Sequence, residues 1–287
     1  MNNKGDNMKN TIIALIYDFD KTLCDRDMQE YSFIPNLGLT PTEFWSETDK
    51  LAKENKMDKI LACMYMMLKK SNELEKPLKR EDFNKLGNTI EFYRGIEDWF
   101  KRINDYGEQI GVTVEHYIIS SGNKEIIEGT PIGKYFKEIY ASEFLYNKEG
   151  IAVWPAMSVN YTTKTQFLSR INKGVLDVSE DNILNAKMLD ENRRISTKNM
   201  IYIGDGFTDI PSMRMVREKG GYSIAVYQKD KTDTVKTLLK EDRVDYITEA
   251  DYRENSQIDI IIKEMILNMK INTNLREKHK EQLEKYK

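Results

Sequence analysis

Five apolar runs along the chain predict the strands of one sheet. The first, residues 11–17, is a continuous β-branched run in which polar and apolar positions do not alternate. Such a run is typical of a strand buried on both faces, as in a parallel sheet. Similar runs follow at residues 115–119, 200–203, 222–226 and, in a shorter form, 244–247.

Helical patterns separate these runs. In residues 95–106 the apolar positions recur at the spacing of one helix face, and residues 164–171 and 211–218 are also predicted to be helical. Strands that alternate with helices indicate βαβ units. We therefore expect an α/β fold with a doubly wound, Rossmann-like parallel sheet.

Residues 25–93 interrupt the alternation. They contain no convincing buried strand and have the pattern of helices, the middle one of which is apolar nearly all round. A helix of that kind is buried at the centre of its domain. We therefore expect a smaller helical domain, inserted after the first strand, between core segments at residues 10–24 and 94–270. The predicted helices of the insertion span residues 41–55, 58–71 and 80–92.

Four further segments lie outside these elements. Residues 145–161 contain a glycine and a proline and are expected to form a hairpin or an irregular loop. Residues 177–194 are polar and are expected to be a surface insertion. Residues 271–287 are expected to be a helix or tail of mixed charge. Residues 1–9 are expected to be a polar, frayed end.

Composition narrows the class of protein. The 287 residues include 44 Lys and Arg against 47 Asp and Glu, for a net charge of −3. A nucleic-acid-binding protein would usually carry a basic excess, so we expect no nucleic-acid partner. No apolar run approaches the ~20 residues of a membrane span, so we expect no membrane partner. Two cysteines are too few for a disulfide framework, which favours a reducing cytoplasm. The pattern specifies no oligomeric state.

Two pairs of acidic residues follow predicted strands. Asp18 and Asp20 come directly after the first strand, and Asp205 and Asp209 come after the strand at residues 200–203. Open α/β sheets bind ligands at this carboxyl edge. Because buried carboxylates without counter-charges are costly, we expect a cation beside them, and carboxylate oxygens favour Mg²⁺.

Anion-binding groups follow another strand. Residues 118–123 read IISSGN, a strand followed by two hydroxyls and Gly122. Hydroxyl and backbone N–H groups at such a turn suit an anion. Lys164, at the start of a predicted helix, adds a positive charge.

The four motifs together resemble the haloacid dehalogenase (HAD) superfamily, and its phosphatases in particular. Their order along the chain is the family's order, and each acidic or hydroxyl motif follows a predicted strand. The insertion at residues 25–93 stands where this family carries a helical C1-type cap, in a layout that looks like the phosphoserine phosphatase branch. The matching residues are Asp18, Asp20 and Thr22 for the first motif, Ser120 for the second, Lys164 for the third, and Gly204, Asp205 and Asp209 for the fourth.

The resemblance implies an Mg²⁺-dependent phosphatase that hydrolyses a small phosphorylated metabolite. Asp18 would attack phosphorus and form an aspartyl-phosphate, and Asp20 would act first as general acid and then as base. The metal would be bound by Asp18, Asp205 and the backbone carbonyl of Asp20. Asp209 would act through bound water or by orienting Lys164. The phosphate would be held by Ser120, Ser121, Gly122, Lys164 and Thr22.

The sequence leaves several assignments open. The second-motif hydroxyl is Ser120 or Ser121, and Ser120 is favoured because the family pattern has one residue between the hydroxyl and the glycine. The phosphate-binding lysine is Lys164, with Lys124 and Lys21 as alternatives. Selectivity for the substrate is expected from residues just after the first motif and on the cap. The candidates by position are Asp27, Glu30, Tyr31 and Arg94.

The sulfur-bearing side chains near these motifs are expected to pack rather than to react. Cys24 has no histidine in a suitable context, so we expect a buried, inert thiol. Met64, Met66 and Met67 are expected to form the core of the cap rather than a binding surface.

Other functions are compatible with parts of the same pattern. A cap that excludes water would suit phosphoryl transfer between substrates, as in a mutase. A non-catalytic phospho-ligand binder is a further alternative, although it would not need both Asp18 and Asp20. A dinucleotide site is disfavoured because Asp209 stands where the third glycine of the GxGxxG pattern belongs.

Overall fold

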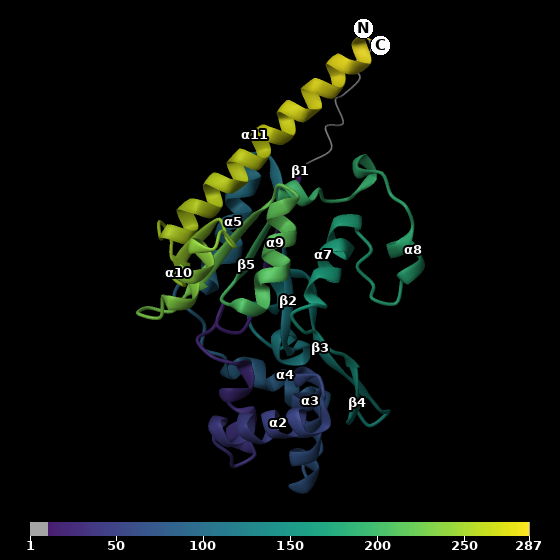
Figure 1. The fold of residues 1–287 in the computed structure, drawn as a ribbon, viewed down its shortest axis with the longest axis vertical. Coiled ribbons are helices and arrows are strands. Elements are labelled where there is room, and N and C mark those ends of the chain that lie inside the picture. The colour runs from purple at the N-terminus through teal and green to yellow at the C-terminus, as the bar shows by residue number, and fades with distance from the viewer. Residues whose placement is uncertain (1–10, 287) are drawn as a thin grey trace.

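Within residues 11–286, which the computed structural model describes, the chain forms a seven-stranded sheet in the order β4-β3-β2-β1-β5-β6-β7 (Figure 1). Its strands are β1 (Thr11–Tyr17), β2 (Val112–Asn123), β3 (Phe136–Tyr146), β4 (Ala152–Met157), β5 (Met200–Gly204), β6 (Tyr222–Tyr227) and β7 (Tyr246–Glu249). All pairings are parallel except that of β4 with β3 at one edge. The predicted α/β fold with a doubly wound parallel sheet is therefore confirmed.

Helices cover both faces of this sheet. They are α5 (Ile96–Gln109), α6 (Lys124–Glu128), α7 (Lys164–Lys173), α8 (Asp181–Asn185), α9 (Ile210–Glu218), α10 (Asp233–Lys240) and α11 (Gln257–Lys285). The central strand β1 is buried on both faces, as its continuous apolar run predicts. α5 and α11 share a core with Ile13 and Leu15 on one face, and α7, α9 and α10 share a core with Ala14 and Ile16 on the other.

A second group of helices forms a lobe at the carboxyl ends of the strands (Figure 1). It consists of α1 (Phe33–Asn36), α2 (Pro41–Asn55), α3 (Lys59–Glu73) and α4 (Arg80–Leu86). α2 and α3 lie close to their predicted bounds because each begins at a strong N-cap. The Thr40 hydroxyl accepts from the Glu43 amide, and the Asp58 carboxylate accepts from the amides of the first turn of α3. That the lobe is a domain bounded by residues 25 and 93 stays a prediction.

The β3–β4 hairpin contacts the helical lobe. Near its tip, the Arg80 amide donates to Gly150 O at 3.0 Å, so the segment before α4 pairs with the hairpin. α4 also packs closely on α6, since a Cβ on Gly129 would lie 1.8 Å from Asn84 O. The lobe is therefore joined to the core through packing and hydrogen bonds, and not only through its two connecting segments.

The hairpin begins earlier than the sequence predicts. The apolar-run pattern assigns no strand to residues 136–144, and the expected hairpin or loop at 145–161 covers only the tip and β4. β3 mixes charged residues with apolar ones and alternates irregularly between buried and partly exposed positions. It lies next to the edge of the sheet, where such a mixture is tolerated, and a search for fully buried strands misses it.

The predicted helix at residues 80–92 is wrong beyond Leu86. α4 ends there, a 3-10 turn, η2 (Gly87–Thr89), follows, and Phe92 then pairs with Cys24 in a short bridge. The backbone of the core is the physical reason for the early end. A Cβ on Gly87 would lie 2.4 Å from Ile126 O, so the chain turns where it meets α6.

The remaining differences concern segments near the C-terminus. The strand predicted at residues 244–247 is β7, two residues further on. Residues 271–285 continue α11, a single helix of 29 residues. Of the two expected alternatives for this segment, a helix or a tail, the structure therefore has the helix. The insertion at residues 177–194 contains the short exposed α8. The expected frayed end at residues 1–9 lies outside the described residues.

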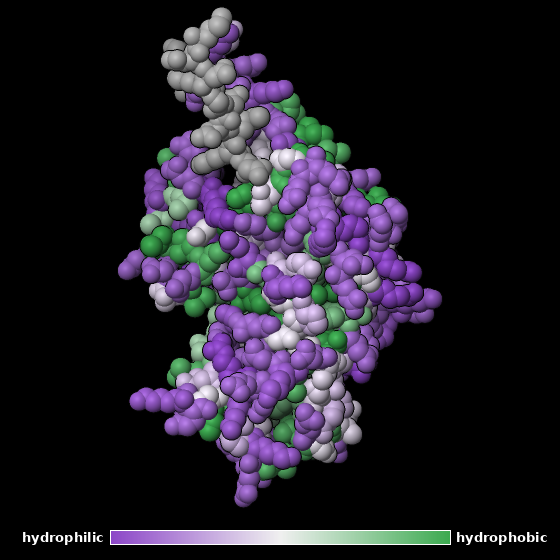
Figure 2. Space-filling view, turned by 180° about the vertical axis from the view of Figure 1, so that it is seen from behind, coloured by the Kyte–Doolittle hydropathy of each residue, from purple (hydrophilic) through white to green (hydrophobic). Residues whose placement is uncertain are grey.

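The surface carries mainly hydrophilic side chains on the face seen from behind, and it narrows where the lobe meets the sheet (Figure 2). None of the helices within residues 11–286 combines the length and the apolar character that crossing a membrane would require.

A row of buried polar side chains links β1, β2 and α5. The Trp99 indole donates to Tyr17 OH at 2.9 Å, and Tyr17 OH lies 3.1 Å from His116 Nδ1. On the other side of the ring, His116 Nε2 lies 3.0 Å from Asn104 Oδ1. These contacts suit a neutral imidazole that accepts at Nδ1 and donates at Nε2. Burial lowers the pKa of His116 from 6.5 to about 3.

We expect His116 to make the protein less stable below neutral pH. The folded state keeps the ring neutral down to about pH 3, whereas the unfolded chain takes up a proton below pH 6.5. This contribution to stability is therefore complete above pH 6.5 and is lost as the pH falls toward 3. Between about pH 7.5 and about pH 5.5 the free energy of unfolding should fall by about 1.4 kcal/mol from this group.

Urea unfolding of the wild type and of His116→Gln at both pH values measures this effect. The variant should lack that part of the pH dependence, whatever its absolute stability. An equal change in both proteins would show that His116 is not the titrating group.

Candidate active site

Three neighbouring strands bring the predicted acidic residues to one edge of the sheet. β1 pairs in parallel with β2 on one side and β5 on the other, so their carboxyl ends meet. Asp18 follows β1, and its amide donates to Ile203 O of β5 at 2.9 Å. Asp205 follows β5 directly, and Asp209 ends the short turn η6 (Phe207–Asp209). This edge faces the helical lobe (Figure 1).

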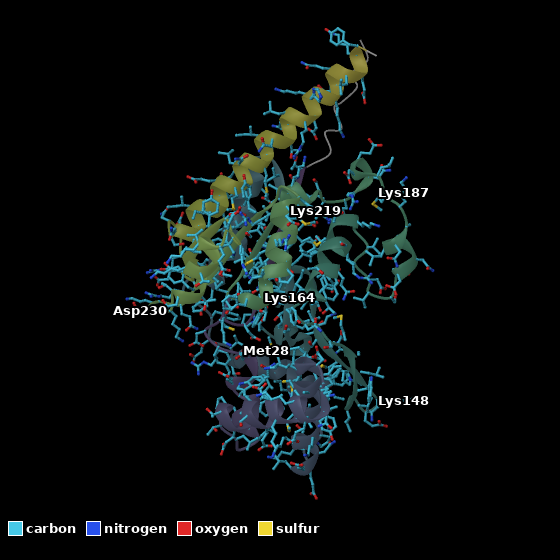
Figure 3. The ribbon with its side chains drawn as sticks, in the orientation of Figure 1. Met28, Lys148, Lys164, Lys187, Lys219 and Asp230 are labelled. Atoms are coloured by element: carbon cyan, nitrogen blue, oxygen red, sulfur yellow. The ribbon has the colours of Figure 1, made fainter. Side chains whose placement is uncertain are left out.

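Lys164 is a buried cation at this edge (Figure 3). Its Nζ lies 2.8 Å from Asp18 Oδ2 and 2.8 Å from Asp209 Oδ1. Tyr202 OH also donates to Asp209 Oδ1, at 2.8 Å. Although burial lowers it, the charges of Asp18 and Asp209 raise the pKa of Lys164 well above its usual value. The lysine therefore stays charged between the two carboxylates.

The carboxylates at this edge form a place for a cation. Carboxylate oxygens of Asp18, Asp205 and Asp209 lie within 4.8 Å of one another. Burial, together with the charges of Asp209 and Asp18, raises the pKa of Asp205 to about 8. Asp209 Oδ2 is buried and has no hydrogen-bond partner in the part of the chain that the structure describes. An all-oxygen set with an unpartnered buried carboxylate oxygen fits Mg²⁺.

The Asp20 side chain is not in this acidic group. Its Oδ1 accepts from the Met28 amide at 2.9 Å, at the start of the helical lobe. Gly122 leaves the space for this arrangement, since a Cβ there would lie 3.0 Å from Asp20 Oδ2 and 2.1 Å from Met28 Cε. Burial and the charges of Asp27 and Asp18 raise the pKa of Asp20 well above its usual value. Asp20 can therefore hold a proton, as a general acid must.

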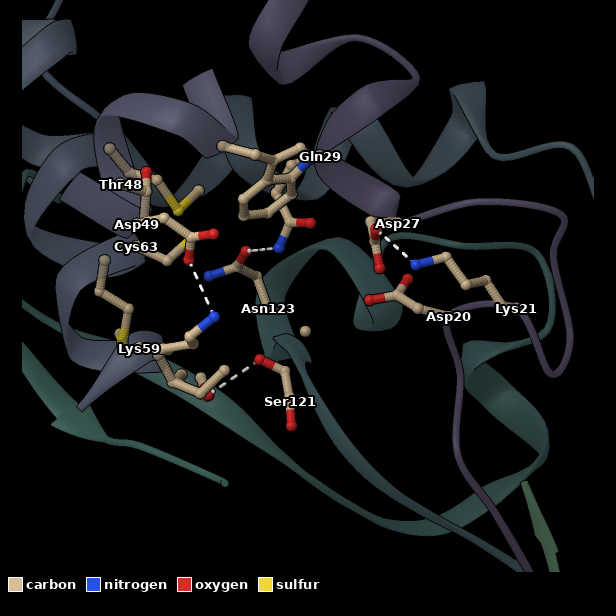
Figure 4. A pocket seen from close by; sticks show the side chains of 16 residues that line it. Asp20, Lys21, Asp27, Gln29, Thr48, Asp49, Lys59, Cys63, Ser121 and Asn123 are labelled. Carbon is tan, nitrogen blue, oxygen red and sulfur yellow. Dashed lines mark hydrogen bonds and ion pairs between the residues drawn. The ribbon is translucent and has the colours of Figure 1, made fainter. Parts of the chain in front are cut away.

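A cavity of about 480 Å³ lies between this edge of the sheet and the helical lobe (Figure 4). Asp20, Ser121 and Gly122 line it on the core side, and α2 and α3 supply the opposite wall. A molecule that reaches Asp20 therefore contacts both lobes. The lining residues of α2 and α3 are Trp45, Thr48, Asp49, Lys59, Ile60, Cys63, Met64 and Met67.

The predicted phosphate-binding residues after β1 and at the end of β2, which extends to Asn123 rather than ending at residue 119, lie in different places. Ser121 and Gly122 line the cavity. Ser120 is fully buried, and its hydroxyl accepts from the Gly122 amide at 3.1 Å. Thr22 is also fully buried, does not line the cavity, and has an Oγ1 without a partner within residues 11–286. The structure thus brings Ser121 and Gly122, but not Thr22, to the cavity.

The three candidate lysines have different partners. Lys164 contacts Asp18 directly, as described above. Lys124 lies 3.7 Å from Glu138 and 3.6 Å from Glu143. Lys21 lines the cavity, but its Nζ lies 2.6 Å from Asp27 Oδ2. Of the three, only Lys164 makes an ion pair with Asp18, among the ion pairs of the described residues.

Of the four selectivity candidates, only Asp27 lines the cavity. Glu30 does not line the cavity, but its carboxylate accepts a hydrogen bond at 2.7 Å from the indole of Trp45, which does. Tyr31 and Arg94 are not part of the lining, and Arg94 is exposed. Position after the first motif is therefore a weak guide to the cavity wall.

Most of the wall that the lobe provides is not among the residues expected from the sequence. Met64 and Met67, expected to be core only, are buried and yet line the cavity. Thr48 and Asp49 follow Trp45 by three and four residues on α2, so each lies one helical turn from it on the same face. Their shared helix face could have indicated a common role, but nothing in the local sequence indicates which face of α2 turns toward the sheet.

Cys24 is not placed for reaction. It is fully buried, and burial, together with the charge of Asp20, raises the pKa of its thiol well above the usual value. The thiol therefore stays protonated at neutral pH, as expected for an inert packing residue.

The sequence matches the model of a known family over most of its length. Residues 15–214, a span that contains all four motifs, match the haloacid dehalogenase-like hydrolase family. The chain belongs to this family. The resemblance inferred from the motifs is thereby confirmed, and the chain is a hydrolase of this family.

The regions in which this haloacid dehalogenase-like hydrolase matches its relatives cover most of the chain. An uncharacterized protein from Borreliella burgdorferi is 27% identical over 280 residues, which cover 88% of this chain and 95% of that one. A HAD family hydrolase from Salmonella enterica serovar Typhi has a TM-score of 0.53 at 17% identity, over 87% of this chain and 69% of that one. A substrate-bound phosphoserine phosphatase has a TM-score of 0.52 at 17% identity, over 86% and 97%. At such identities the two structures establish the fold.

Replacing Lys164 by methionine should destabilise the protein. The change leaves Asp18 and Asp209 buried without their counter-charge, which costs about 3–5 kcal/mol. Urea unfolding with EDTA present measures the loss. Lys236→Met, at an exposed lysine of α10, is the matched control and should change stability little. An equal effect of both substitutions would show that the buried ion pairs do not support the fold.

Proposed function

We propose that this protein is an Mg²⁺-dependent phosphatase that hydrolyses small phosphate monoesters through an aspartyl-phosphate on Asp18. The observation that carries the proposal is the convergence of Asp18, Lys164, Asp205 and Asp209 next to the cavity that Asp20 lines. Membership of the haloacid dehalogenase-like hydrolases supports it. A phosphoserine phosphatase with the same fold supports a phosphate ester as the substrate class.

Asp18 is the proposed nucleophile because both of its oxygens are oriented. Oδ1 accepts from the Phe19 amide at 2.7 Å, and Oδ2 faces Lys164 Nζ at 2.8 Å. Attack by the carboxylate forms a phosphorus–oxygen bond while the bond to the leaving alcohol breaks. The charge of Lys164 remains beside the transferring group, where it stabilises the negative charge of the transition state.

Asp20 is the proposed proton donor and acceptor. It lines the cavity that would hold the leaving alcohol, and its raised pKa keeps a proton available for the leaving oxygen. In the second step the ionised Asp20 takes a proton from the water that attacks phosphorus of the aspartyl-phosphate, the bond from phosphorus to the Asp18 oxygen breaks, and inorganic phosphate leaves. This returns both aspartates to their starting states.

Asp18, Asp205 and Asp209 are the side chains that would hold Mg²⁺, and the backbone carbonyl of Asp20 is a further expected ligand. The bound cation would offset the negative charge of the phosphoryl group and of the acidic residues around it. A phosphate dianion would otherwise be repelled by this cluster, which is why we expect activity to need the metal.

Turnover of p-nitrophenyl phosphate tests the nucleophile and the metal. The wild type should turn over this ester with Mg²⁺, lose activity in EDTA, and regain it when Mg²⁺ is added back. Asp18→Asn should be folded and have no measurable turnover, whereas Asp190→Asn, at a 94% exposed carboxylate, should match the wild type. Activity that survives EDTA or the Asp18 substitution would refute the proposed chemistry.

A second substitution separates the two chemical steps. Asp20→Asn should lower kcat by about 10²–10⁴-fold, because proton transfer to the leaving group and from water is lost. Its aspartyl-phosphate should accumulate and be detectable by intact-mass spectrometry after acid quenching. No phosphorylated protein should form in the double variant with Asp18→Asn, and its appearance there would place the intermediate on another residue.

A further inference from the structure

The charged side chains that line the cavity are already paired with one another. Lys21 Nζ lies 2.6 Å from Asp27 Oδ2, and Lys59 Nζ lies 3.0 Å from Asp49 Oδ1 (Figure 4). The one other charged lining residue among those described is Asp20, which the proposed function uses for proton transfer. Apart from Asp20, the cavity therefore offers no unpaired cation to a carboxylate and no unpaired carboxylate to an ammonium group.

The Lys21–Asp27 pair affects selectivity more than the Lys59–Asp49 pair does, because it lies beside the reacting atoms. Asp27 adds to the negative potential at Asp20, and Lys21 offsets it. The side chains of Lys21 and Asp27 are 44% and 31% exposed, so their ion pair is partly shielded from solvent. An ammonium group next to the leaving oxygen would have to displace Lys21 from Asp27. The Lys59–Asp49 pair is more exposed, with side chains 72% and 49% accessible, and can exchange partners more readily.

Two neutral side-chain amides in the cavity wall contact each other instead. Gln29 comes from the 3-10 turn η1 (Met28–Glu30) and Asn123 from the end of β2. Gln29 Nε2 donates to Asn123 Oδ1 at 2.8 Å, and both residues are at least 95% buried. Whichever way the two amides are turned, one acceptor and one donor are left without a partner among the described residues. A hydroxyl group, which both donates and accepts, matches that pair.

The lobe side of the cavity adds an apolar surface. Trp45 lines it, and the bond from its indole to Glu30 at 2.7 Å fixes the plane of the ring. Met64, Met67 and Ile60 line the cavity beside it. A flat, partly apolar ring fits such a surface. A volume of about 480 Å³ accommodates an alcohol larger than a three-carbon unit.

We propose that the cavity selects phosphate monoesters whose alcohol is uncharged, bears hydroxyl groups and has one flat apolar face, as in a sugar or a nucleoside. Gln29 and Asn123 would bind a hydroxyl of that alcohol, and Trp45 would pack on its ring. This selectivity rests on the proposed function of the same site. It separates this protein from an enzyme that recognises a zwitterionic amino-acid phosphate.

The test compares kcat/KM for a panel of esters with Mg²⁺, with p-nitrophenyl phosphate as the measure of the chemistry alone. Glucose 6-phosphate and a nucleoside 5′-monophosphate represent the two sources of an uncharged hydroxylated alcohol. Phosphoserine, phosphocholine and 3-phosphoglycerate represent zwitterionic, cationic and anionic alcohols. At least one of the uncharged alcohols should exceed all three charged ones by about tenfold or more.

Variants of the wall test the residues that carry the selectivity. Gln29→Leu should lower kcat/KM for the preferred ester by at least about tenfold more than for p-nitrophenyl phosphate, because a buried polar group of the alcohol loses its partner. Gln109→Leu, the same substitution at an exposed position of α5, is the matched control and should leave the ratio unchanged. Lys59→Met should raise the relative kcat/KM for phosphocholine, since it frees Asp49.

The outcomes distinguish this inference from the proposed function. Turnover of p-nitrophenyl phosphate with a preference for phosphoserine or another charged ester would overturn the selectivity and leave the phosphatase chemistry intact. If the wild type turns over no ester, thermal shifts of Asp18→Asn with each ester and Mg²⁺ measure binding alone. Stronger stabilisation by an uncharged ester would then support the inference although the proposed function fails. Equal or weaker stabilisation by it would overturn the inference as well.

Discussion

The site depends on one buried lysine between two carboxylates. Asp18, Asp205 and Asp209 follow strands whose ends meet, and this brings their negative charges together in a place with little solvent. Lys164 lies 2.8 Å from two of them and offsets their charge. Without this cation the cluster would be expected to take up protons or to separate. The position of α7, which carries Lys164 at its first turn, is therefore as important to the chemistry as the strand order.

The helical lobe takes part in placing the proton donor. Asp20 belongs to the turn after β1, but its carboxylate accepts from the backbone amide of Met28, where the chain enters the lobe. The backbone N–H of Asn123 also contacts Met28 Sδ, at 3.1 Å, so the end of β2 meets the same residue. Gly122 has no side chain because Met28 and Asp20 occupy that space. Orientation of the general acid and closure of the cavity are thus consequences of the same contacts.

The sequence predicts the parts of the molecule that local chemistry determines. The buried strand β1, the acidic residues after β1 and β5, and the N-caps of α2 and α3 each have a signal within a few residues, and the sheet follows from them. β3 and the end of α4 are different. β3 is a strand because β2 and β4 pair with it, and α4 ends where Gly87 meets the backbone of α6. Such contacts join residues far apart in the chain, and periodicity carries no trace of them.

The same distinction separates the chemistry of the site from its selectivity. Asp18, Asp20, Asp205 and Asp209 stand at strand ends, so a motif locates them, and Lys164 is located by the order of the motifs. Gln29 and Trp45 have no motif, because they meet Asn123, the last residue of the IISSGN segment, only when α2 and η1 are folded over the end of β2. Charge compensation in the cavity is likewise invisible in the composition, since it depends on which lysine faces which aspartate. A chain of this family can therefore keep one set of reactions while the residues that line the cavity, from the lobe and from the ends of β1 and β2, determine its substrate.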